Sequence, residues 1–151
     1  MSDYPITRAH LKIACEKRMW DLLDKFLEID AGHVNDKSMF TDTWGSWWSL
    51  LCEVVGRNQI NGVKVLLKHG ADPNLSSWGD GIPETPIEMA KDKPKILALL
   101  LNPQDVVYER KTDPPLPQWK EAAREIELIN RQGVVRDQTG LVFQVEAFKD
   151  E

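Results

Sequence analysis

Residues 65–74 read VLLKHGADPN, an apolar run that ends in glycine, alanine and aspartate. The apolar residues favour a helix, and Gly70 stands just past its end, where a left-handed residue is needed and a Cβ costs energy. Asp72 and Asn74 carry short polar side chains that hydrogen-bond the backbone of a turn. The stretch therefore predicts the last part of a helix followed by a tight turn.

The residues before this stretch complete a structural unit. Residues 49–74 contain two short helical patterns, in the order helix, turn, helix, turn. This unit resembles an ankyrin repeat, because residues 65–74 reproduce that family's outer-helix end and its Gly-Ala-Asp-x-Asn turn. The resemblance implies a stack of helix-turn-helix units whose function is to bind other proteins.

A further copy follows this unit. The sequence TPIEMA at 85–90 is similar to the family's Thr-Pro-Leu-His start of an inner helix, with Glu88 in the place of the histidine. Pro86 is tolerated there because the first turn of a helix leaves its N–H groups unpaired. Residues 95–101 supply the second helix, and no Gly-Ala-Asp turn comes after them. We expect this copy to be the last of the array.

A degenerate first copy precedes the central unit. Residues 9–15 and 20–27 show the same two helical patterns, and residues 31–35 stand where the family's turn falls. The three copies start 40 and 36 residues apart, whereas a minimal repeat has about 33 residues. The loops between copies are therefore long, and they enlarge the face that ankyrin proteins use for binding.

The sequence thus predicts a mainly α-helical fold, an ankyrin-repeat solenoid of about three helix-turn-helix repeats at residues 1–101. Residues 102–117 are expected to be a proline-rich connector, since DPPLP at its end is incompatible with a helix interior. Residues 118–151 are expected to form a C-terminal helix plus a β-hairpin that pack on the last repeat. The helix is predicted over 118–130 and the hairpin over 134–145.

Composition excludes several classes of protein. The 151 residues have a net charge of -5, which offers no basic footprint for nucleic acid. The longest apolar run, 96–101, is far too short to cross a bilayer, so no membrane association is predicted. Residues 1–5 lack the start of a secretory signal, which leads us to expect a cytoplasmic location. Cys15 and Cys52 lie in apolar segments and are interpreted as core residues.

Neither catalytic nor metal-binding motifs stand out. The histidines His10, His33 and His69 lack the spacing of metal ligands, and there is no phosphate-binding loop or nucleophile elbow. Carboxylates at helical spacing, namely Asp21, Asp24, Glu121, Glu125 and Glu127, are interpreted as solvated polar faces. We therefore expect a protein that is not an enzyme and that uses no cofactor and no metal.

Tryptophan is the unusual feature of the composition. Four of the six tryptophans, Trp44, Trp47, Trp48 and Trp78, lie in the two loops between repeats or just before an inner helix. Tryptophan is enriched at interface hot spots, which favours a protein-binding role for these loops. The alternative is structural: Trp47 and Trp48 would close the gap between repeats, and Trp44 and Trp78 would cover the elongated loops.

The same loops are acidic, and their partner-facing acids are expected to be Asp36, Asp42, Asp80 and Glu84. An aromatic centre with an acidic rim suits a basic protein partner, although loop acids also serve simply to solubilise a surface. The small acidic chain with irregular repeats is similar to bacterial ankyrin-containing immunity proteins, which implies binding and neutralisation of a cognate toxin. The alternative is an ankyrin adaptor or regulatory protein that docks a host or cellular partner. In either case we expect a monomer when free.

Overall fold

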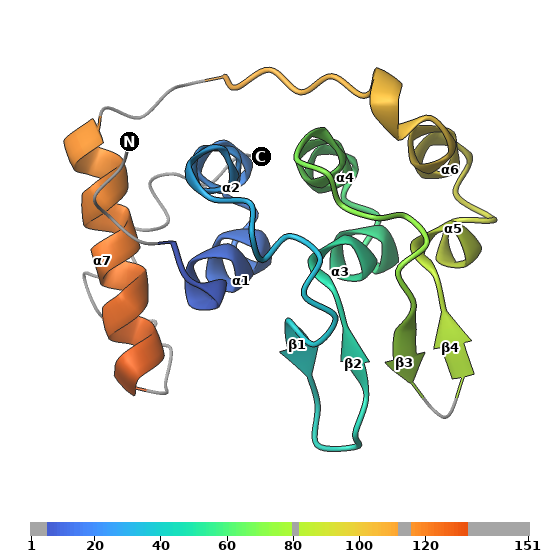
Figure 1. The fold of residues 1–151 in the computed structure, drawn as a ribbon, viewed down its shortest axis with the longest axis horizontal. Helices are drawn as coiled ribbons and strands as arrows, with labels where there is room; N and C mark the ends of the chain where they lie inside the picture. The colour runs from blue at the N-terminus through green and yellow to red at the C-terminus, as the bar shows by residue number, and fades with distance from the viewer. Residues whose placement is uncertain (1–5, 80–81, 112–115, 133–151) are drawn as a thin grey trace. The chain divides into compact units, whose positions relative to one another are not determined.

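The computed structural model describes residues 6–79, 82–111 and 116–132. Within these ranges the chain forms seven α-helices, one short 3₁₀ helix and four β-strands (Figure 1). Helices predominate, as the prediction of a mainly helical protein expects, but the described fold is mixed because it also contains a small four-stranded antiparallel sheet. The chain divides into two compact units, residues 31–109 and residues 1–30 with 110–151, and each is described by itself.

The unit of residues 31–109 consists of two helix pairs and two β-hairpins. Its elements are β1 (Phe40–Thr41), β2 (Trp47–Trp48), α3 (Leu50–Gly56), α4 (Ile60–Lys68), β3 (Ser77–Gly79), β4 (Ile82–Glu84), α5 (Pro86–Met89), α6 (Pro94–Leu101) and the 3₁₀ helix η1 (Pro103–Asp105). Helix α3 packs beside α5, and α4 packs beside α6 (Figure 1). The first helix of each pair therefore forms one row and the second helix forms another.

The two hairpins join into one sheet on the side of the first helices (Figure 1). The strand order is β1-β2-β3-β4 and every neighbouring pair is antiparallel. Strands β2 and β3 meet at a single pair of residues, Trp47 opposite Trp78. The sequence predicts loops in these segments, because strands of two or three residues are too short to show an alternating pattern.

Hydroxyl side chains cap the first helix of both pairs. The Ser49 hydroxyl accepts a hydrogen bond from the Cys52 N–H, at 3.3 Å. The Thr85 hydroxyl accepts from the Glu88 N–H at 3.1 Å, and the Glu88 carboxylate accepts from the Thr85 N–H at 2.8 Å. These reciprocal bonds satisfy two backbone donors that a helix start leaves unpaired. They explain why α5 starts where TPIE predicted a helix, since Glu88 supplies the second bond of the cap.

The turns that follow the second helices are linked to each other by a side chain. Asn35 donates from Nδ2 to the Gly70 carbonyl at 3.1 Å, and its Oδ1 accepts from the Asp72 N–H at 2.8 Å. Asp72 in turn accepts from the Asn74 N–H at 2.9 Å. Gly70 has φ +92°, which confirms the left-handed residue expected after α4. The conformation of the GADPN turn is therefore set by its own backbone geometry and by the two hydrogen bonds from Asn35 of the preceding turn.

The other unit is a three-helix cluster made of α1 (Arg8–Glu16), α2 (Trp20–Ile29) and α7 (Leu116–Gln132). Helix α1 packs on both α2 and α7. Trp119 of α7 is fully buried and its ring meets the edge of Phe26, with centroids 6.4 Å apart. Ala122, Ala123 and Ile126 complete a buried stripe along α7. The amphipathic helix expected over 118–130 is therefore present.

The partner of this helix within its own unit is α1, where His10 donates from Nε2 to the Ala123 carbonyl at 3.0 Å. Packing of the C-terminal helix on the last repeat stays a prediction. An amphipathic pattern shows which face of a helix is buried and says nothing of what buries it. The connector predicted over 102–117 contains η1, and its last two residues belong to α7. The hairpin predicted over 134–145 lies outside the described residues.

Three carboxylates assigned to a solvated face are instead buried, and one of them is Glu125 of α7, which is 9% exposed. Asp21 and Asp24 of α2 are 2% and 0% exposed. Arg110 donates from Nε to Asp24 Oδ2 at 2.8 Å and also pairs with Glu28, while the Lys111 N–H donates to Asp21 Oδ1 at 3.3 Å. Because these partners lie some 86 to 90 residues further along the chain, α2 alone gave no sign of them.

No helix in the described ranges combines the length and apolar character needed to cross a membrane.

Candidate functional site

The β1–β2 hairpin holds a tryptophan out into solvent. Asp42 closes the connection, since its Oδ1 accepts from the Trp44 N–H at 2.9 Å and from the Ser46 N–H at 3.0 Å. Gly45 has φ +87°, a conformation that the turn requires and that a Cβ would penalise. Trp44 follows Asp42 at the tip and is 88% exposed. A large apolar side chain is thus displayed on an ordered turn.

Trp48 has the opposite environment. Its ring stacks on Phe40 with centroids 6.0 Å apart and planes 7° from parallel. Its indole Nε1 donates to Glu53 Oε1 at 2.7 Å, and Glu53 also pairs with Arg57 one turn further along α3. These contacts hold Trp48 between β1 and α3 and leave it half-buried.

Trp47 and Trp78 form a cross-strand pair. They are directly opposite each other in β2 and β3, which places both side chains on the same face of the sheet. Trp47 is half-buried and Trp78 is 39% exposed. Trp48 follows Trp47 in the strand and therefore belongs to the other face. The four predicted tryptophans thus occupy three places. Trp44 lies at the hairpin tip, Trp47 and Trp78 share one face of the sheet, and Trp48 lies on the other face.

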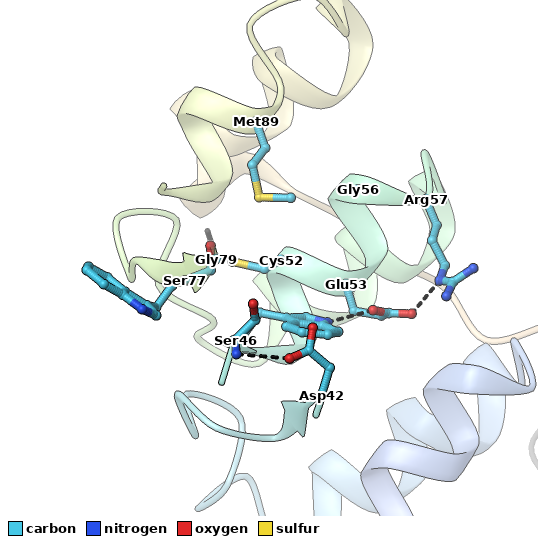
Figure 2. Close-up of a pocket in the computed structure, with 11 residues that line it drawn as sticks. Asp42, Ser46, Cys52, Glu53, Gly56, Arg57, Ser77, Gly79 and Met89 are labelled. Carbon is cyan, nitrogen blue, oxygen red and sulfur yellow. Dashed lines mark hydrogen bonds and ion pairs between the residues drawn. The ribbon is translucent and has the colours of Figure 1, made fainter. Parts of the chain in front are cut away.

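A cleft of about 480 Å³ opens in the unit of residues 31–109, and residues from the hairpins, α3 and α5 line it. Figure 2 shows Met89 of α5 on one side and Glu53 of α3 and Asp42 of the hairpin on the other. Trp48 adds aromatic surface to its wall. The volume is in the range of about 300–1,000 Å³ that is usual for ligand clefts.

The predicted acids have different roles. Asp36 Oδ1 accepts from the Ser38 N–H at 3.0 Å, so Asp36, like Asp42, stabilises a turn. Glu84 is exposed at the end of β4, and its charge is felt by the Cys52 thiol in the cleft. Asp80 lies outside the described residues. Two of the four acids therefore have a structural function beside any contribution to a charged rim.

Cys52 lines the cleft and carries a thiol. Burial raises the pKa of the thiol above its usual value, and the negative charge of Glu84 raises it further. Because the thiolate is the reactive form, this thiol is held in its unreactive state. Across residues 6–79, 82–111 and 116–132, no three His, Cys, Asp or Glu side chains are gathered as metal ligands.

Four further residues of this region were not among the predicted site residues: Phe40, Glu53, Arg57 and Met89. Glu53 and Arg57 stand four residues apart on α3, a spacing that signals an ion pair on a helix. That spacing was visible in the sequence. Phe40 and Met89 reach the region through strand pairing and helix packing, which no local pattern encodes.

Comparisons with known proteins supply no relative. No family model, no curated protein and no solved structure matches this chain.

Proposed function

We propose that the chain is a protein-binding module without catalytic activity, built on ankyrin-type repeats. Helices α3–α4 and α5–α6 with their hairpins would be two repeats, and α1–α2 a third, degenerate one. Support comes from the two rows of helices, the left-handed Gly70 and the side-chain link from Asn35 to the Gly70–Asp72 turn. The hydroxyl caps recur as well, since Thr7 caps α1 as Ser49 and Thr85 cap α3 and α5.

The observation that carries the proposal is the 88% exposure of Trp44 on a turn fixed by Asp42. An exposed indole on an ordered turn loses little conformational freedom when a partner covers it, and it brings a large contact area. Trp78, at 39% exposure, offers a second contact on the adjoining hairpin. Both are suited to act as hot spots in a protein interface.

The more specific proposal is an immunity protein that binds and neutralises a cognate toxin in the cytoplasm. Its support is the net charge of -5 and the acidic hairpin region, which complement a basic partner surface. An ankyrin adaptor for a host or cellular protein is the second candidate. It is favoured by a separate apolar feature away from the sheet, the side chains of Leu101 and Val107, which are 56% and 68% exposed.

The test co-expresses the chain with the products of neighbouring genes and measures cell growth. Rescue of growth from one toxic product, together with a purified complex, supports the immunity function. Trp44→Ala should weaken that complex by about 2 kcal/mol, or roughly 30-fold in Kd, whereas the control Lys95→Ala, at an exposed residue of α6, should leave Kd unchanged. A toxic neighbour that is neither bound nor neutralised would refute the immunity function.

The basic nature of the partner is tested by kinetics. Replacing Asp36, Asp42 and Glu84 by their amides keeps an oxygen that accepts the turn hydrogen bonds and removes the charge. Rim charges act mainly on the association rate, so the variant should associate more slowly and with a weaker dependence on salt. Trp44→Ala should instead chiefly raise the dissociation rate. A wild-type association rate that is indifferent to salt would contradict a basic partner.

A further inference from the structure

We infer that the cleft between the hairpins, α3 and α5 receives one arginine side chain from the basic partner. This inference rests on the proposed protein-binding function and specifies which group of the partner enters the molecule. It is separate from the Trp44 contact, because Trp44 lies at the hairpin tip and does not line the cleft.

The walls of the cleft suit the aliphatic part of such a side chain. Met89 extends toward the cleft from α5, as Figure 2 shows, and the opposite wall includes the half-buried Trp48. The Trp48 indole is fixed by its stacking on Phe40 and its bond to Glu53, so its position is set before a ligand arrives. A planar cation that stacks against an indole gains about 0.5–2 kcal/mol, depending on its desolvation.

The charge of the cleft favours a cation over a neutral side chain. Asp42 and Glu53 line it, and Glu84 is close enough for its charge to act on Cys52. Arg57 is the cation in the lining, and it pairs with Glu53. Neither Asp42 nor Glu84 has an ion-pair partner among the described residues, so the cleft keeps a negative excess. Arginine fits better than lysine because its planar guanidinium can stack on an indole and bind a carboxylate through two N–H groups.

The hydrogen bonds of Asp42 leave room for this contact. Oδ1 accepts the two backbone N–H groups of the turn, while no described residue donates to Oδ2. Asp42 is exposed, and a guanidinium in the cleft reaches Oδ2 without breaking the turn. The hairpin that displays Trp44 thereby also presents a carboxylate to the cleft.

The experiment titrates the full chain with the blocked peptide acetyl-GGRGG-amide and follows it by ¹H–¹⁵N NMR. The control peptide carries citrulline, which has the shape of arginine and no charge. We expect saturable shifts of the Trp48 indole N–H and of the amides of Glu53 and Met89, with a Kd on the order of 1 mM, as befits one side chain. The citrulline peptide should cause at most a tenth of these shifts at equal concentration.

Matched variants locate the binding. Asp42→Asn with Glu84→Gln should raise the Kd of the arginine peptide at least fivefold, since the Asn oxygen preserves the turn. The control is Glu109→Gln, which removes an exposed acid of the same unit and should change Kd less than twofold. Equal binding of the citrulline peptide, shifts away from the cleft, or an equal effect of Glu109→Gln would overturn the inference. The proposed protein-binding function would survive such a result as long as Trp44→Ala weakens a purified complex.

Discussion

The buried His10 should make the stability of the protein depend on pH. Its Nδ1 accepts the Thr7 N–H at 2.9 Å and its Nε2 donates to the Ala123 carbonyl at 3.0 Å, a pattern that requires the neutral ring with its proton on Nε2. Burial lowers the pKa of His10, while the Ala123 carbonyl and the Glu127 carboxylate, 3.6 Å from Nε2, raise it by less. Protonation of Nδ1 would also remove the acceptor of the Thr7 N–H.

The sign follows from the lowered pKa. As pH falls below about 6.5, the unfolded chain takes up a proton at His10 and the folded chain does not, so the free energy of unfolding decreases. The decrease continues down to the pKa of the folded state and then stops. A single site contributes at most about 1.4 kcal/mol per pH unit, which sets the upper limit of the slope between pH 6.5 and 5.5.

The assay is urea unfolding followed by far-UV circular dichroism at pH 7.5, 6.5, 6.0 and 5.5. The test variant is His10→Gln, because glutamine at this position still accepts the Thr7 N–H as in other capping boxes. It should be less stable than the wild type at pH 7.5 by about 1–2 kcal/mol and should lack most of the slope. His33→Gln is the control and should keep the slope. If His10→Gln retains the wild-type pH dependence, the argument from burial is wrong.

Three further substitutions test the fold. Gly70→Ala should lower the free energy of unfolding by about 1 kcal/mol in thermal melts. A Cβ there meets no atom within 4 Å, so the cost comes from φ +92° alone. Asn58→Gly, at another left-handed residue, should change the stability by no more than about 0.5 kcal/mol in the same melts. Asp24→Asn should lower the free energy of unfolding by about 3 kcal/mol, because it removes one charge of the buried pair with Arg110. The double substitution Asp24→Leu with Arg110→Met removes both charges and should cost less. Equal losses of stability in the two variants would argue against the pair. Asn35→Ala should cost about 1–2 kcal/mol through the loss of its two bonds to the next turn, and an unchanged urea midpoint would contradict that link.

Local signals predicted the elements that local physics determines. The turn after α4 and the cap of α5 were readable because a glycine and a Thr-x-x-Glu sequence act within a few residues. The partners of α7 and of Asp24 were not, because both contacts join segments more than 80 residues apart. Thr7 and His10 form a capping box of the same kind as Thr85 and Glu88, and this Thr-x-x-His signal was overlooked.

The candidate site was predictable in the same partial way. Exposure of Trp44 follows from its place between Asp42 and Gly45 in a turn, whereas Trp48 is withdrawn by contacts with Phe40 and Glu53 that need strand pairing. The acids were read as charges, but in Asp36 and Asp42 the carboxylate also has a backbone role that depends on turn geometry. The hydrogen bonds that a loop carboxylate accepts within its own turn therefore determine how much of it is available to a partner.

The three-helix cluster combines helices from both ends of the described chain, and this affects how the protein folds during synthesis. His10 and its acceptor Ala123 are 113 residues apart, and a ribosome that adds about 10 residues per second needs roughly 10 s to cover that distance. During this interval residues 31–109 are being synthesised, and α1 and α2 emerge without α7 and Arg110. The helices made first are thus among the last to reach their final packing. Until then the apolar surface around Phe26 and the carboxylates of Asp21 and Asp24 are open to chaperones and proteases.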